Sequence, residues 1–151
     1  MHSKVNPSWS TPDYWQGRFE QSDTPWQLNR ASTVLMEALD ELESGGFSLA
    51  EKQVLSPGCG RGVDALEVAS RGARVLAVDW SSTAVEDLKS RYEALRSSCH
   101  GAVEVVAGDF FAMEPQPVDI VIEHTFSARS TRRCEKHMRR RSLSGLSLAV
   151  S

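Results

Sequence analysis

The sequence lacks the features that mark disulfide-stabilised, zinc-binding, exported or membrane-spanning proteins. Its three cysteines are an odd number without CxxC spacing, and they stand at Cys59, Cys99 and Cys134. The N-terminal MHSKVNPSWS has no apolar core of signal-peptide length, and no run of about 18 apolar residues occurs anywhere. We therefore expect a protein of the reducing cytoplasm, with no metal site and no membrane partner.

The composition predicts one soluble globular domain with an unusual tail. The chain has 151 residues, of which 40% are hydrophobic and 25% charged. Its net charge of -3 hides an asymmetry, because residues 1–126 carry 10 basic and 19 acidic side chains (-9), whereas residues 127–151 carry 7 and 1 (+6). The body is therefore acidic, and we expect no nucleic-acid partner for it.

Strand-like and helix-like segments alternate along the body. Helical spacing of apolar residues predicts helices at 31–42 and 63–70, and a third that Ser81 and Ser82 can cap and whose apolar face runs from Val85 to Leu95. Short apolar runs predict four strands, at 53–55, 73–79, 103–107 and 118–122. The alternation indicates a doubly wound, Rossmann-like α/β sheet, in which ligands bind beyond the carboxyl ends of the strands.

Residues suited to ligand binding follow each predicted strand. These strand ends are Gly58 to Gly62, Asp79, Gly108 to Phe110, and Glu123 with His124. All four ends carry glycine, acidic or polar groups, and this coincidence is the main functional signal of the sequence.

The sequence SPGCGRG, here called the glycine loop, indicates the kind of ligand. In the dinucleotide fingerprint GxGxxG, a third glycine after Gly58 and Gly60 would stand at Val63, but it stands at Gly62. Asp79 keeps the position of an acid that hydrogen-bonds a ribose diol. The pattern favours a nucleoside without phosphates, such as S-adenosylmethionine, over the NAD of an oxidoreductase. A plain strand-to-helix turn is the alternative.

Other residues also have structural alternatives. Asp79 could cap the following helix, and Asp109 could form a turn or accept a hydrogen bond from an adenine amino group. His124 could be a satisfied polar residue or a site residue. Cys59 has no evident base partner, so we do not expect it to act as a nucleophile.

Five segments in order carry a resemblance to a known family. They are YWQGRFEQSDTPW, VLSPGCGRGVD, VLAVDWSSTAVE, GDFF and DIVIEHTF, which together span about residues 13–126. They resemble the thiopurine S-methyltransferase family, and most of all its halide and thiol methyltransferase branch. The resemblance implies a class I methyltransferase fold, S-adenosylmethionine as methyl donor, a small thiol, thiopurine or halide as acceptor, and a monomer.

The resemblance also implies roles for individual residues. In that family, aromatic residues spaced by four and seven close over the cofactor, and Trp15, Phe19 and Trp26 keep these spacings. Packing of these rings on the domain is the alternative. Cofactor contacts are expected at Trp15, Phe19, Trp26, Gly58, Gly60, Asp79, Gly108, Asp109 and His124.

Two residues depart from the pattern of the resembled branch. Phe19 stands where tryptophan is usual, and His124 stands where the branch carries tyrosine and the thiopurine enzymes arginine. His124 is the candidate catalytic residue, because a side chain with a pKa of about 6.5 can assist deprotonation of a thiol.

The sequence divides into an aromatic cofactor lid (1–30), a cofactor-binding core (31–126) and an Arg/Ser-rich tail (127–151). The tail has six arginines in 25 residues and is predicted to be disordered, a basic binding patch being the alternative. Since the resemblance ends there, we expect a chain truncated or frameshifted after about residue 126, with about four of roughly seven strands. It is then either an active methyltransferase or an inactive cofactor-binding remnant.

Overall fold

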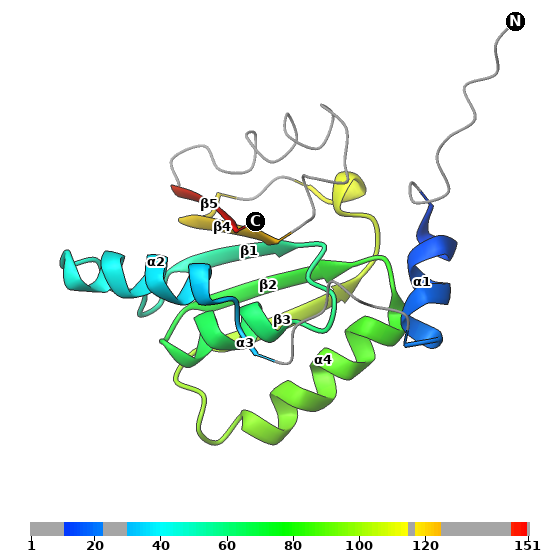
Figure 1. The fold of residues 1–151 in the computed structure, drawn as a ribbon, viewed down its shortest axis with the longest axis horizontal. Coiled ribbons are helices and arrows are strands. Elements are labelled where there is room, and N and C mark those ends of the chain that lie inside the picture. The colour runs from blue at the N-terminus through cyan, green and yellow to red at the C-terminus, as the bar shows by residue number, and fades with distance from the viewer. Residues whose placement is uncertain (1–10, 23–29, 115–116, 125–145, 151) are drawn as a thin grey trace, which may run out of the picture.

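A computed structural model describes residues 11–22, 30–114, 117–124 and 146–150, and it contains a parallel five-stranded sheet. The strands are β1 (Gln53–Pro57), β2 (Arg74–Asp79), β3 (Ala102–Ala107), β4 (Ile120–His124) and β5 (Leu146–Val150). They lie side by side in the order β3-β2-β1-β4-β5 (Figure 1). The order reverses at β1, which is the topology of doubly wound sheets, so the predicted fold class is confirmed.

The described helices are close to those that the apolar spacing predicts. They are α1 (Pro12–Glu20), α2 (Thr33–Ser44), α3 (Val63–Ser70), α4 (Ser82–Leu95) and the short 3₁₀ helix η2 (Phe110–Ala112). The bounds of α3 agree with the prediction, and Ser81 caps α4 by accepting a hydrogen bond from the Ala84 backbone N–H at 3.1 Å.

Helix α1 lies in the segment 1–30, for which the sequence predicts an aromatic lid but no helix. Its start follows ordinary rules, since Thr11 is the N-cap residue, Pro12 opens the first turn and Asp13 places a negative charge there. These signals precede two of the aromatic residues, so the expected lid is helical where the structure describes it.

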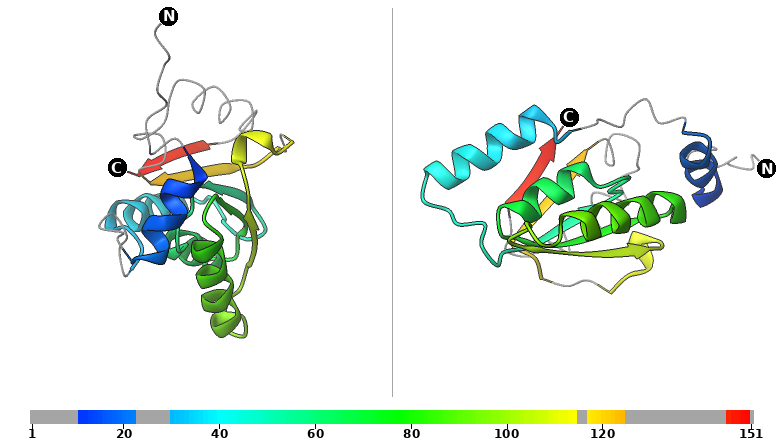
Figure 2. Two further views of the ribbon diagram at one scale, coloured as in Figure 1. Left: turned by 90° about the vertical axis from the view of Figure 1, so that its right-hand side faces the viewer. Right: turned by 90° about the horizontal axis from the view of Figure 1, so that it is seen from below.

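Helices α2, α3 and α4 cover one face of the sheet (Figures 1 and 2). Alternate strand residues face them and form the larger core cluster with Leu35, Leu39, Val68 and Leu88. The other face carries a smaller cluster of Leu55, Val78, Val121 and Phe110, the last from η2. In β1 and at Ile120–Ile122 of β4 both faces are buried, whereas β3 at the edge exposes Ala102, Glu104 and Ala107.

Strand β5 corrects the prediction for the tail. Residues 127–151 are predicted to be disordered and the sheet to have about four strands, but residues 146–150 pair in parallel with β4 as a fifth strand. The physical reason is that β4 presents an edge of unpaired backbone groups, and the short apolar run LSLAV can satisfy them. Residues 125–145 and 151 lie outside the described part of the chain.

Gly101 sets the start of β3 against the turn that follows α3. Its backbone N–H donates to the Ala69 carbonyl at 2.9 Å, and the next residue, Ala102, donates to the Ala73 carbonyl at 3.1 Å. A Cβ atom at Gly101 would overlap the carbonyl oxygens of Ala73 and Ala69. Only glycine therefore allows β3 to begin at this position. This start sets the register in which β3 pairs with β2 and places Gly108 beside Asp79, at the carboxyl end of β2.

We expect Gly101→Ala to lower the free energy of unfolding by about 1–3 kcal/mol or more, because backbone atoms cannot rotate away from the new methyl group. Urea denaturation measures the change. Gly17→Ala on α1 is the matched control, since nothing lies within 4 Å of the methyl group that it adds. Equal denaturation midpoints for the two variants would contradict this account of Gly101.

Candidate functional site

The carboxyl ends of β1 and β2 and the segment after β3 meet at one edge of the sheet. The glycine loop (residues 56–62) follows β1, Asp79 ends β2, and Gly108 follows β3. The Gly60 backbone N–H donates to Asp79 Oδ2 at 2.8 Å, and the Gly108 N–H donates to the Asp79 carbonyl at 2.9 Å. The structure thus brings together Gly60, Asp79 and Gly108, three of the predicted site residues.

Asp79 is the central group of this edge. The residue is 9% exposed, and its Oδ1 accepts a hydrogen bond from the Ser81 backbone N–H at 2.9 Å. Burial raises the pKa of the Asp79 carboxyl above its ordinary value, while the backbone N–H groups of Ser81 and Gly60 act in the opposite direction. The capping role that the sequence allowed for Asp79 belongs to Ser81 instead.

The glycine loop requires the special freedom of glycine. Gly58, Gly60 and Gly62 have φ angles of 60°, 57° and 71°, in the left-handed region that other residues rarely adopt. At Gly62 there is a second reason, because a Cβ atom would collide with the side chain of Leu88 on α4. The third glycine is therefore explained by close packing of helices, and the first two remain candidates for ligand approach.

Cys59 does not have the properties of a nucleophile. Burial raises the pKa of its thiol well above the ordinary value, and the nearby charge of Asp79 raises it further. The side chain packs against the larger core cluster, and its thiol donates to the Gly60 carbonyl at 3.5 Å. A thiol in this setting stays protonated at neutral pH.

The segment after β3 contains two predicted site residues, Gly108 and Asp109. No atom lies within 4 Å of the position that a Cβ would take at Gly108. The next residue, Asp109, is exposed and accepts a hydrogen bond from the Phe111 N–H at 2.9 Å, so it caps η2. Asp109 thus has the turn-forming role that the sequence allowed, while its exposed carboxylate keeps capacity for further hydrogen bonds.

Helix α1 carries the two described aromatic residues of the expected lid. Phe19 is 3% exposed, whereas Trp15 is half-buried and packs edge-to-face on Tyr14, with ring centroids 5.1 Å apart. Figure 1 shows α1 at the end of the sheet toward which β1, β2 and β3 run. Between the two rings stands Gln16, which no motif singled out, and its amide oxygen accepts from Ser81 Oγ at 2.8 Å.

Two predicted site residues have no described side chain. Trp26 lies in the segment 23–29, outside the described residues. His124 is the last residue of β4, and only its backbone is described. Its place on the strand next to β1 is at the reversal of strand order, where ligands of doubly wound sheets bind. The structure does not test their predicted roles.

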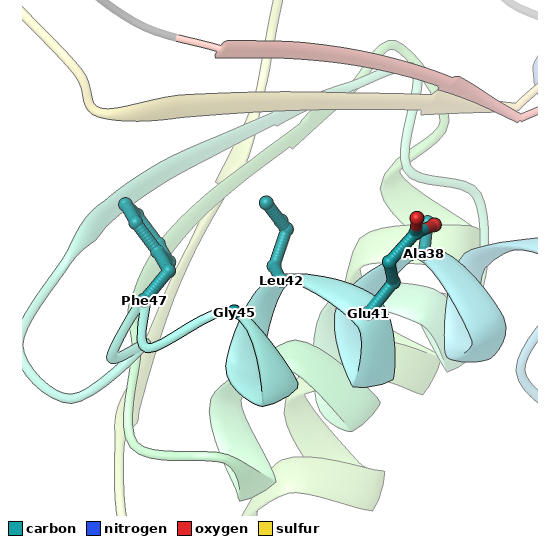
Figure 3. A pocket seen from close by; sticks show the side chains of 5 residues that line it. All are labelled: Ala38, Glu41, Leu42, Gly45 and Phe47. Atoms are coloured by element: carbon teal, nitrogen blue, oxygen red, sulfur yellow. The ribbon is translucent and has the colours of Figure 1, made fainter.

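A pocket lies away from the carboxyl edge of the sheet. Figure 3 shows a pocket of about 360 Å³ lined by the second half of α2 and by Phe47, on the chain that leads into the amino end of β1. Its lining holds one charged residue, Glu41. Within the described ranges, no group of three or more His, Cys, Asp or Glu side chains is arranged to hold a metal ion.

The carboxyl edge has the chemistry of a nucleoside site. An ionised carboxylate has about four acceptor positions, and Asp79 accepts from the backbone N–H groups of Gly60 and Ser81, with the Trp80 N–H as a third donor. Acceptor capacity remains on this group for a ribose hydroxyl. The space at Gly108 is open, and Gly58 and Gly60 have positive φ angles without a Cβ atom, so these residues fit S-adenosylmethionine.

Asp79 should make stability depend on pH with a definite sign. Because its pKa is raised in the folded chain, its contribution to stability is complete below the ordinary value of 3.8 and is lost as the pH rises toward the raised value. We expect the free energy of unfolding of the wild type to fall, relative to that of Asp79→Asn, from about pH 4 upward. Urea denaturation in pH steps measures this difference.

The matched control for this experiment is Asp87→Asn, since Asp87 lies on α4 in a surface ion pair with Arg91 at 2.8 Å. A difference between wild type and Asp79→Asn that stays constant with pH would contradict the burial of a perturbed carboxyl at this position.

Comparisons with known proteins agree with the fold and with the motifs. A probable thiol methyltransferase 2 of Arabidopsis thaliana is 32% identical over 113 residues, covering 74% of this chain and 47% of that protein. A thiopurine S-methyltransferase of Pseudomonas fluorescens is 30% identical over 110 residues, covering 67% of this chain and 48% of that protein. The chain spans about half the length of these curated relatives.

Among solved structures, the magnesium protoporphyrin IX methyltransferase of Synechocystis PCC 6803 with bound S-adenosylmethionine matches with a TM-score of 0.72. The match covers 97% of this chain and 76% of that chain at 14% identity, so it shows a shared fold. No helix in the described part of the chain is long and apolar enough to cross a membrane. The model of the thiopurine S-methyltransferase family matches residues 10–129, from before α1 to beyond β4, and the chain therefore belongs to that family.

Proposed function

We propose that this chain binds S-adenosylmethionine at the carboxyl edge of its sheet and acts as a methyltransferase on a small thiol, thiopurine or halide. The observation that carries the proposal is the buried Asp79 carboxylate, hydrogen-bonded to Gly60 of the glycine loop at 2.8 Å, in a chain of this family. The free, half-buried thiols of Cys59 and Cys99 suit the reducing cytoplasm, where we place the protein as a monomer.

Each part of the edge has a distinct role in this proposal. Asp79 accepts a hydrogen bond from a ribose hydroxyl, and Gly58 and Gly60 let the backbone approach the methionine part of the ligand. Gly108 and Asp109 border the adenine. The rings of Trp15 and Phe19 close the site from the side of α1 and exclude water from it, and we assign Trp26 to the same lid.

Local charge favours this ligand over a dinucleotide. The N-terminus of a helix usually attracts phosphate, but the first turn of α3 carries Asp64, which accepts a hydrogen bond from the Ser32 N–H at 2.9 Å. With Asp79 hydrogen-bonded to Gly60, two carboxylates lie beside a loop that itself carries one cation, Arg61. The excess of negative charge disfavours a pyrophosphate and suits a ligand with positive charge.

When bound, the sulfonium of S-adenosylmethionine supplies an activated methyl group. The protein must hold donor and acceptor in line and keep water out, which positioning achieves without a covalent intermediate. A thiol has a pKa of about 8.5, so a minor thiolate fraction exists at pH 7, and halides need no base. We assign His124, at the end of β4, to accept the proton of a thiol acceptor.

Binding of S-adenosylhomocysteine by calorimetry tests the cofactor site. We expect the purified chain to bind it more tightly than NADH, and the 2′,3′-dideoxy analogue to bind at least about tenfold more weakly, because Asp79 then loses its hydrogen bond to the ribose. Asp79→Asn should lose affinity in parallel, while Asp87→Asn keeps it. Equal affinity for the ligand and its dideoxy analogue would overturn the role of Asp79.

Turnover tests whether the chain is an enzyme and what His124 does. We expect methyl transfer to iodide and to a small alkyl thiol, and for His124→Ala a loss of about 100-fold at pH 7 with the thiol alone, since iodide has no proton to lose. Full thiol turnover in the variant with saturating cofactor, or equal losses with both acceptors, would contradict the assignment. Binding without turnover in the wild type would support the inactive remnant.

A further inference from the structure

Gln16 connects α1 to the body of the protein through both ends of its side-chain amide. The Gln16 Oε1 accepts from Ser81 Oγ at 2.8 Å and from the Thr83 backbone N–H at 3.3 Å. Its Nε2 donates to Thr83 Oγ1 and to Glu20 Oε1, each at 2.7 Å. One amide thus joins the middle of α1 to the first turn of α4.

Ser81 continues this connection to the proposed ribose site. The residue is fully buried, with 0% exposure, and its backbone N–H donates to Asp79 Oδ1 at 2.9 Å. The other oxygen of Asp79 accepts from the Gly60 N–H at 2.8 Å. A continuous hydrogen-bond relay therefore runs from the glycine loop through Asp79 and Ser81 to Gln16 on α1.

The relay determines which hydrogen-bond donors and acceptors the side chain at position 16 must have. The Ser81 hydroxyl has one hydrogen, and its oxygen already accepts from the Ala84 N–H at 3.1 Å, so this hydrogen needs an acceptor. Thr83 presents a backbone donor and a hydroxyl oxygen together. A side chain that accepts from Ser81 and from the Thr83 N–H, and also donates to Thr83 Oγ1, meets all three demands. Glutamine does so with one planar group.

Helix α1 depends on such tertiary contacts. It has nine residues, and a helix of that length is marginal in water unless it is docked. The ring of Phe19 is buried and the amide of Gln16 contacts the body of the protein. Trp15 immediately precedes Gln16 in the same helix. The position of both rings is therefore tied to the relay.

We propose that Gln16 is a positioning residue that couples the docking of α1 to the filling of the ribose site at Asp79. The inference rests on the proposed function, because it takes the ligand of Asp79 to be the nucleoside part of S-adenosylmethionine. A ribose held by Asp79 orders the carboxylate, and the ordered carboxylate holds Ser81 and Gln16 in their described positions. By linkage, a docked α1 raises the affinity for the ligand by the same factor.

The test compares Gln16→Met, which keeps the size of the side chain and removes its hydrogen bonds, with Gln21→Met at the exposed end of α1 as the control. Hydrogen exchange of the α1 amides, with and without S-adenosylhomocysteine, reports docking, and calorimetry reports affinity. In the wild type and in Gln21→Met, we expect the ligand to slow exchange in α1.

In Gln16→Met, we expect the ligand to leave exchange in α1 nearly unchanged, to protect the Gly60 amide still, and to bind about five- to tenfold more weakly. A general loss of folding would also expose Gly60, so the pattern separates coupling from instability. Wild-type binding with an equal response of α1 in Gln16→Met would overturn the coupling alone. Failure of the wild type to bind the ligand would overturn the proposed function, and the coupling with it.

Discussion

The arrangement of the carboxyl edge depends on one buried carboxylate and the backbone N–H groups that it accepts from. Asp79 joins the glycine loop after β1 to the start of α4, through Gly60 at 2.8 Å and Ser81 at 2.9 Å. Burying an ionised carboxyl without partners is costly, so these two hydrogen bonds and the fold around them stabilise each other. The loop conformation, the cap of α4 and the contact with α1 all follow from that requirement.

In the proposed function, the same carboxylate contributes to the choice of ligand. Asp79 and Asp64 place negative charge beside the glycine loop, where a dinucleotide-binding protein would present a helix N-terminus to pyrophosphate. A buried, partly desolvated acid interacts more strongly with a nearby cation than a surface acid does. The proposed ligand, a nucleoside that carries a positive charge, uses both the charge and the hydrogen-bonding capacity of Asp79.

Most of the fold was predictable because local and global preferences agree in the segment from α2 to β4. The apolar spacing of VDALEVAS gives α3 its observed bounds of Val63–Ser70, and parallel strands necessarily bring Asp79 and Gly108 to one edge. Helix α1 was missed because its aromatic and polar residues form no clear stripe. Strand β5 was missed because LSLAV is too short to be distinguished from coil without the edge of β4 beside it.

The sequence by itself determined the order of strands and helices, the glycines at the positive φ angles and the identity of the acid at the end of β2, since periodicity and residue type are local properties. It also carried the motifs of the family. Only the tertiary structure decided that Gly62 serves packing against Leu88 and that Gln16 joins α1 to Asp79 through Ser81. Those contacts link residues as many as 65 positions apart, and no local pattern encodes which distant groups a hydrogen bond will join.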